Sequence, residues 1–195
     1  MRIIFMAFVS TLALLNTVSA AITGAHYRQN LDSSYSLSDN VADTKLFDRV
    51  AFYSNRNLAR ALEDLRITQS RVCLIVPIGD HYADGKSGDI GQSERFTEFM
   101  LVMSERDFSI NAGLGVTNQS PGILNIKDLA VNLLTRKSFS VEGLIVRVSP
   151  DAGAIVQMEW KEDRQPAADT SGRECWNQIF RANAGIIRTE MGRRT

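Results

Sequence analysis

The chain has 195 residues, and its 22 Lys and Arg residues balance its 22 Asp and Glu residues to a formal net charge of zero at pH 7. Domains that bind nucleic acid gather Lys and Arg into a basic patch, whereas the nearest equivalent here is a short basic tail ending in Arg193 and Arg194. We therefore expect no nucleic-acid partner, and the length fits one domain with a substantial hydrophobic core.

The first twenty residues have the pattern of a secretory signal. Arg2 precedes a small and apolar run over residues 3–15, and Val18-Ser19-Ala20 supplies the small residues that a signal peptidase needs. The run is shorter than the roughly twenty residues that span a bilayer. Residues 1–20 are thus predicted to be a cleaved signal, with an exported protein, periplasmic or secreted, that starts near Ala21 and has no stable membrane span. The alternative is a hydrophobic N-terminal helix or an uncleaved anchor.

Two different segments follow. Residues 21–43 are polar and rich in Ser and Asp, which predicts an extended arm or linker before a domain over residues 44–195. From Thr44, apolar residues recur at spacings of three, four and seven, which is typical of an amphipathic helix over residues 44–65. Ser54-Asn55 lies in its middle and suits a second N-cap, so the segment forms either one bent helix or two.

The central part of the chain predicts two strands and two loops. Arg71 to Pro77 is apolar and rich in β-branched residues, which indicates a buried strand ended by Pro77 and Gly79. A long loop is expected over residues 78–93, followed by an alternating strand from Glu94 to Arg106. A second loop is expected over residues 111–122.

The C-terminal part predicts a helix, a hairpin and a final strand. The helix starts at Asn125 as its cap, and its apolar stripe is complete. The hairpin joins Val141–Val148 to Ala154–Lys161, with Val156, Met158 and Trp160 facing inward. Glu174–Ala182 is interpreted as a strand, although a short helix fits almost as well. The order α-β-β-α-β-β-β predicts a single α+β domain, with a mostly antiparallel sheet and two main helices packed on one face.

The sequence does not match the motifs that are typical of catalysis or cofactor binding. Gly79 to Ser87 resembles a phosphate-binding loop, but five residues separate Gly79 from Gly85 where such a loop has four. The acidic residues nearby lack the spacing of a calcium loop, and two histidines are too few for a multi-histidine zinc site. A nucleophile elbow is also missing. We therefore predict no catalytic residue, no metal and no cofactor, and we do not expect an enzyme.

The loop over residues 78–93 is the candidate interaction site, because long loops in compact domains are usually functional or disordered. Its candidate contact residues are Asp80, His81, Tyr82, Asp84, Lys86 and Asp89.

Cys73 and Cys175 are candidates for a disulfide, since an exported chain with an even cysteine count often forms one. The competing interpretation is that Cys73, inside an apolar strand, is a small core residue.

Three stretches of the sequence resemble the tail terminator and minor tail proteins of long-tailed bacteriophages. The first is Asn57-Leu58-Ala59-Arg60-Ala61-Leu62 followed by the strand Val72 to Val76. The second is the strand Phe96 to Arg106, which ends in Ser104-Glu105-Arg106-Asp107. The third runs from Ile123 to Leu134 and leads into Ser149-Pro150-Asp151-Ala152-Gly153. Together these stretches cover roughly residues 44–182.

This resemblance implies a non-enzymatic structural subunit that associates with itself or with other structural proteins, typically as a ring that finishes a tail tube. Such proteins assemble in the cytoplasm into a virion without export, and the signal-like N-terminal segment departs from that pattern. An exported binding or accessory module of a bacterial envelope is therefore the alternative function. Its ligand surface would be formed by the two long loops.

Overall fold

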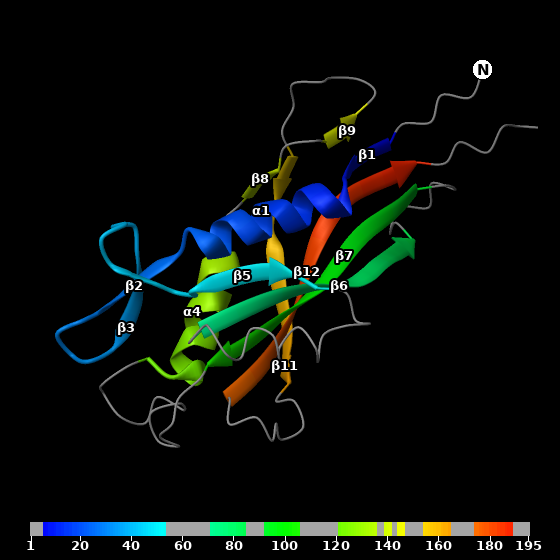
Figure 1. The fold of residues 1–195 in the computed structure, drawn as a ribbon. Coiled ribbons are helices and arrows are strands. Elements are labelled where there is room, and N and C mark those ends of the chain that lie inside the picture. The colour runs from blue at the N-terminus through cyan, green and yellow to red at the C-terminus, as the bar shows by residue number, and fades with distance from the viewer. Residues whose placement is uncertain are drawn as a thin grey trace, which may run out of the picture.

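The structure is a computed structural model, and it describes residues 6–53, 71–84, 92–105, 121–135, 139–141, 144–146, 154–164 and 174–188. These ranges contain two helices, α1 (Thr11–Thr23) and α4 (Ile123–Thr135), together with a seven-stranded, a three-stranded and a two-stranded sheet (Figure 1). The predicted class, an α+β domain with a mostly antiparallel sheet, is confirmed.

Three long strands form the centre of the main sheet. They are β6 (Arg71–Asp84), β7 (Gln92–Glu105) and β12 (Glu174–Arg188), and β7 pairs antiparallel with both of the others. The predicted final strand is therefore confirmed, and it continues past Ala182 to Arg188.

Shorter strands complete the main sheet on both sides. β5 (Arg49–Phe52) lies parallel to β6 at one edge. On the other side, β12 pairs with β11 (Met158–Arg164) along its first half and with β1 (Met6–Val9) near its end. β1 in turn pairs with β9 (Leu144–Val146), so the first strand of the chain lies between two later ones.

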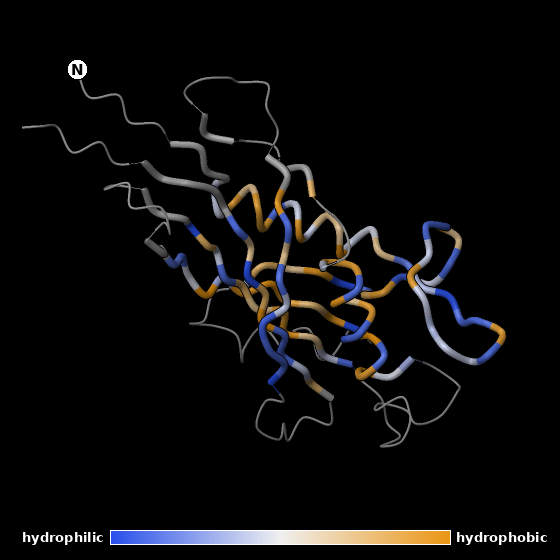
Figure 2. Tube along the Cα trace, turned by 180° about the vertical axis from the view of Figure 1, so that it is seen from behind, coloured by the Kyte–Doolittle hydropathy of each residue, from blue (hydrophilic) through white to orange (hydrophobic). Residues whose placement is uncertain are grey.

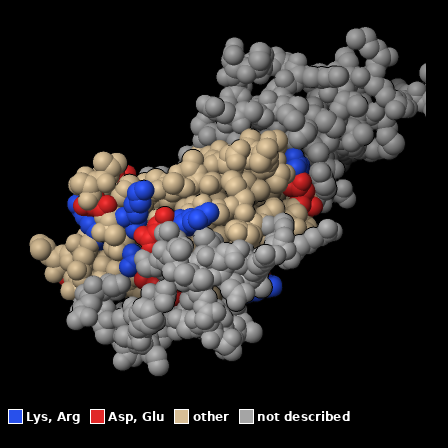
Figure 3. Space-filling model, in the orientation of Figure 1, with Lys and Arg blue, Asp and Glu red and all other residues tan. Residues whose placement is uncertain are grey.

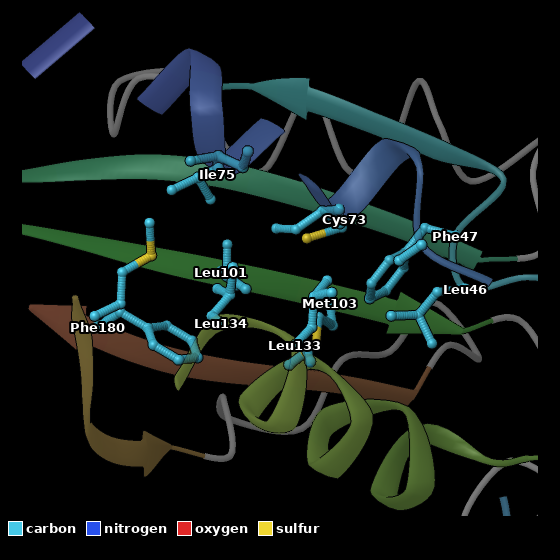
Figure 4. Packing of buried hydrophobic residues seen from close by; sticks show 14 of the residues in the cluster. Leu46, Phe47, Cys73, Ile75, Leu101, Met103, Leu133, Leu134 and Phe180 are labelled. Carbon is cyan, nitrogen blue, oxygen red and sulfur yellow. The ribbon is translucent and has the colours of Figure 1, made fainter. Parts of the chain in front are cut away.

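The alternation of β7 divides the core into two layers. Phe99, Leu101 and Met103 are fully buried on the face that carries both helices, as the sequence pattern predicts. Figure 4 shows Leu101 and Met103 of β7 between side chains of β6 and of α4. On the opposite face Val102 joins a smaller cluster with three residues of β6: Val72, Leu74 and Val76.

Helix α1 has a clear start and a buried face. The Ser10 side chain accepts a hydrogen bond from the Ala13 backbone N–H at 3.1 Å, which caps the helix. Four apolar side chains point into the larger core cluster: Leu14, Leu15, Val18 and Ile22. The helix therefore contributes one wall of that core.

The signal-like segment thus forms structural elements of the described fold. Residues 6–9 are β1 and residues 11–20 are most of α1. Leu14 and Val18 have no exposed surface. Cleavage near Ala21 stays a prediction, but in this structure it would remove a strand from the sheet and a helix from the core.

Residues 21–43 are not the predicted arm. They contain the end of α1, β2 (His26–Gln29) and β3 (Tyr35–Ser38), and β2 also pairs with β4 (Thr44–Lys45). This small sheet is held to the domain because Tyr27 is buried in the core, with its ring edge against Tyr35. The high Ser and Asp content of this segment hides the alternation of Tyr35 and Leu37 with serines along β3, and β2 has no alternating pattern.

The predicted helix over residues 44–65 is wrong at its start. Residues 44–45 and 49–52 form β4 and β5, and residues 54–70 lie outside the described residues. Leu46 and Phe47 are buried in the core between the two strands. Both residues lie in the connection between β4 and β5, and the residues of these two strands are themselves exposed or half-buried.

The predicted helix after residue 122 is confirmed, with a different start. Ile126, Leu129, Ala130, Leu133 and Leu134 are all buried. However, α4 begins at Ile123, so Asn125 lies inside the helix instead of capping it. Ile123 is itself buried, and the Ile126 backbone N–H donates to the Gly122 carbonyl at 3.1 Å.

The predicted hairpin between residues 141–148 and 154–161 is realised in part. β8 (Phe139–Val141) pairs with β10 (Ala154–Val156), whereas β9 pairs with β1 and β11 pairs with β12. Residues 147–153 lie outside the described residues.

Trp160 was predicted to face inward, but its side chain is 45 % exposed. A register shift between Trp160 and Glu162 interrupts the ladder at this point. The indole N–H instead donates to Asp163 at 2.9 Å, so the ring lies at the border of the core.

Candidate functional site

The candidate loop over residues 78–93 is largely strand. β6 continues to Asp84 and β7 begins at Gln92. The prediction that the strand ends at Pro77 and Gly79 is therefore wrong. A register shift between those two residues accommodates them inside the hairpin. Asp80, His81, Tyr82 and Asp84 lie on β6, while Lys86 and Asp89 lie outside the described residues.

Asp80 is part of a network that joins the hairpin to α1. Its carboxylate accepts hydrogen bonds from Arg95 and from Thr97 on β7, and the Arg95 guanidinium also donates to Thr11 Oγ1 at 2.7 Å. Partial burial alone would raise the pKa of Asp80, but the bonds from Arg95 and Thr97 hold this pKa below its usual value. Asp80 therefore has a structural role at the start of the first helix.

His81 lies on the opposite face of the hairpin from Asp80. Its Nε2 is 3.1 Å from Glu98 Oε2, and Arg181 Nε on β12 is 3.5 Å from the other oxygen of Glu98. The Arg181 guanidinium also lies over the Phe96 ring, 4.4 Å from its centroid. The two predicted contact residues Asp80 and His81 therefore belong to separate clusters on the two faces of the sheet.

A second, partly buried network holds α4 to the sheet. Asp163 on β11 accepts hydrogen bonds from Lys127 at 2.8 Å, Trp160 at 2.9 Å and Gln178 at 3.1 Å. Partial burial alone would raise the pKa of Asp163, but hydrogen bonds from these three donors lower it.

This network has an expected pH dependence. A carboxyl whose pKa is lower in the folded state stabilises the fold above its unfolded pKa of about 3.9, and loses that contribution as the pH falls. The difference in unfolding free energy between wild type and Asp163→Asn should be constant above about pH 5 and shrink below about pH 4. Denaturant titrations across this range measure it. A difference that stays constant down to pH 2.5 would contradict the role of the ionised carboxylate.

The two cysteines are free thiols in the structure. Cys73 pairs with Met103, whereas Cys175 pairs with Ser104, so the two side chains lie on opposite faces of the sheet with β7 between them. The geometry prevents the candidate disulfide. Cys73 is fully buried, and burial raises the pKa of its thiol well above the usual value.

The described residues contain no group of three or more His, Cys, Asp and Glu side chains placed to hold a metal ion. Within the same ranges, no helix is long and apolar enough to cross a membrane.

The surface feature that sequence reasoning missed is the small sheet formed by β2, β3 and β4. It projects from one end of the domain, and Figure 2 shows a hydrophobic segment near the end of each of its two loops. The large hydrophobic side chains exposed there are Leu31, with 109 % relative exposure, and Val41, with 82 %. The sequence contains one indication of this surface, which is the presence of the apolar residues Leu31 and Val41 within polar segments.

The exposed face of α1 continues this surface. No residue of α1 is charged, and Leu12 is 68 % exposed. Figure 3 shows an uncharged area across the middle of this side of the molecule, with charged side chains toward its ends. We call α1 and the small sheet together the candidate assembly surface, because α1 is uncharged and exposed apolar side chains such as Leu12, Leu31 and Val41 are typical of protein contacts.

A second feature that the sequence did not indicate is a groove of about 410 Å³ beside β11. It is lined by Phe96, Thr135, Gln157, Met158, Glu159, Trp160, Arg181 and Asn183. Seven of these residues come from α4, β7, β11 and β12, and Gln157 lies between β10 and β11. No local pattern in the sequence therefore predicts the groove.

A scan of the sequence against protein-family models finds no match, and a search of curated proteins finds none either.

Proposed function

We propose that this protein is a non-enzymatic structural subunit that associates with copies of itself into a ring, as the resemblance to phage tail terminator proteins implies. The observation that carries the proposal is the projecting small sheet, which holds Leu31 and Val41 in water on an otherwise well-packed domain. An exposed Leu or Val gains about 1.5–3 kcal/mol when a partner buries it.

The position of α1 supports assembly without export. The exported alternative requires the loss of the first twenty residues, whereas Leu14, Leu15 and Val18 are buried in the core of the described fold. A chain that keeps these residues fits assembly in the cytoplasm. The described charged clusters also support a structural role, since Asp80 and Asp163 are engaged in hydrogen bonds that join elements of the fold.

The test is the mass of the full chain by size-exclusion chromatography with light scattering over a range of concentrations. Wild type is expected to form a species at a multiple of 21.7 kDa. The double variant Leu31→Ser/Val41→Ser should shift toward monomer with an unchanged thermal midpoint, because neither side chain is buried within the domain. Phe52→Ser on β5, where the side chain is 44 % exposed, is the control for loss of exposed apolar surface outside the candidate assembly surface. A wild-type chain that stays monomeric at every concentration would overturn the proposal.

A further inference from the structure

Arg71 is the first residue of β6, and its side chain contacts three other parts of the fold. Its Nε donates to Glu105 Oε1 at the end of β7, at 2.8 Å, and its Nη1 donates to the Tyr27 hydroxyl on β2, at 2.7 Å. Its Nη2 donates to the carbonyl of Pro121, shortly before α4, at 3.5 Å. We call Arg71 together with these three partners the arginine hub.

The backbone of Arg71 holds a further segment, which is the connection between β4 and β5. Asp48 in this connection accepts a hydrogen bond from the Arg71 backbone N–H through its side chain, at 2.8 Å. The Asp48 backbone N–H in turn donates to the Arg71 carbonyl at 3.0 Å. The small sheet is joined to the rest of the chain before β2 and after β4. Arg71 therefore contacts the small sheet directly, through Tyr27, and also contacts the segment that leaves it.

The arginine hub is shielded from water. The side chain of Arg71 has 14 % relative exposure and that of Glu105 has 6 %. Tyr27 is also buried, and its ring packs edge-to-face with the ring of Tyr35 on β3, with centroids 6.0 Å apart. Hydrogen bonds to a charged group are stronger than those between neutral groups, and a buried group that loses its partner is destabilised. The hub thus reaches β2 directly and β3 through the tyrosine pair.

Apolar side chains of the small sheet also pack against the domain. Tyr35 and Leu37 of β3 are half-buried against the larger core cluster. Apolar packing is non-directional, so it holds the small sheet against the domain without fixing one angle between them. A guanidinium presents five N–H donors in a rigid plane, so bonds from Arg71 to acceptors on three different segments fix the relative positions of those segments.

We propose that Arg71 is a positioning residue, which gives the small sheet, and with it the candidate assembly surface, one fixed orientation on the domain. The inference rests on the proposed function and identifies a residue on which assembly depends without contact to the partner. A ring needs the same angle between neighbouring copies at every contact, because only a constant rotation closes it. A chain that adopts the required orientation for a fraction of the time binds with an affinity lowered by that fraction.

Two variants weaken the arginine hub and keep most of its packing. Arg71→Lys keeps the positive charge but loses the planar fork that bonds to several acceptors at once. Tyr27→Phe removes only the hydroxyl that accepts from Arg71 and keeps the ring in place, so it serves as the test if Arg71→Lys does not fold. Arg95→Lys is the matched control, since Arg95 is a similarly buried arginine whose bonds to Asp80 and Thr11 join the β6–β7 hairpin to the start of α1.

The distance between two spin labels measures the orientation of the small sheet directly. The labels are attached through Arg28→Cys on β2 and Glu159→Cys on β11, since both positions are exposed. The background carries Cys175→Ser, and Cys73 is fully buried and does not react with the label. Labelled full-length chains are diluted into an excess of unlabelled chains, so each distance that double electron–electron resonance reports lies within one copy.

The labelled background and Arg95→Lys should each give one narrow distance distribution, whereas Arg71→Lys and Tyr27→Phe should give broader ones. If about a tenth of the chains keep the wild-type orientation, self-association of the unlabelled variant weakens about tenfold, which light scattering over a range of concentrations measures. Arg95→Lys should lower the thermal midpoint about as much as Arg71→Lys does. A loss of stability alone then does not account for the broader distribution.

The outcomes separate the inference from the proposed function. Broader distributions and weaker association in both hub variants, but not in Arg95→Lys, support the inference. Narrow distributions in both hub variants, or equal broadening in all three variants, overturn it. Broadening with association at the wild-type level overturns it as well, because assembly then needs no fixed orientation. If wild type is monomeric at every concentration, the proposed function fails, while the distance distributions still decide whether Arg71 positions the small sheet.

Discussion

Deletion of residues 1–20 is expected to abolish the cooperative fold. The deletion removes β1 from between β12 and β9, and it removes the buried side chains Leu14, Leu15 and Val18 from the larger core cluster. Loss of each buried leucine costs about 2–5 kcal/mol, and the loss of several approaches the 5–15 kcal/mol that stabilises a typical domain. Thermal unfolding followed by circular dichroism measures the effect.

A matched pair within α1 serves as the control. Leu14→Ala should lower the free energy of unfolding by about 2–5 kcal/mol, because Leu14 has no exposed surface. Leu12→Ala lies on the same helix but is 68 % exposed, so its effect should stay within about 0.5 kcal/mol. A truncated chain that melts cooperatively within a few degrees of the full chain would show that the first twenty residues are dispensable, as a cleaved signal requires.

Phe180→Ala is expected to be the most damaging single substitution in the main sheet. Phe180 on β12 is fully buried and stacks on Phe99 of the neighbouring strand, with ring centroids 5.6 Å apart. Truncation of a buried phenylalanine leaves a large cavity and costs about 3–5 kcal/mol, which denaturant unfolding measures.

The stacked pair provides the internal comparison. Phe180→Leu keeps most of the buried volume and should cost less than Phe180→Ala. A double-mutant cycle with Phe99→Ala should give a coupling of about 0.5–1.5 kcal/mol, the value typical of aromatic pairs. Purely additive effects of the two substitutions would contradict a direct ring contact.

The fold class followed from the sequence because its strongest patterns are local. The stripe of α4 and the alternation of β7 each place apolar residues on one face, and each face is buried. By contrast, the sequence alone does not distinguish a signal from α1, since a short uncharged apolar helix of the core has the same composition as the apolar region of a signal. The sequence predicts a strand end at Pro77 because the register shift that accommodates this proline depends on pairing with β7, which no local pattern shows.

The candidate site was less predictable than the fold. The sequence predicts one contact site that contains Asp80 and His81 because both lie in the same predicted loop. In the structure they are neighbours on a strand, so their side chains face opposite sides of the sheet. The groove gathers Phe96, Trp160 and Arg181 from three strands that meet only in the folded chain. Leu31 lies in the segment that the sequence predicts to be a polar arm. The sequence alone does not show which side chain of a turn is exposed to solvent.

The most direct test of the account is native mass spectrometry of the full, unmodified chain at micromolar concentration. We expect a single dominant stoichiometry of three or more copies, each retaining residues 1–20, because the proposed ring closes at a fixed number of copies. A spectrum that contains monomer alone, or a chain that has lost its first twenty residues and remains folded, would contradict the account.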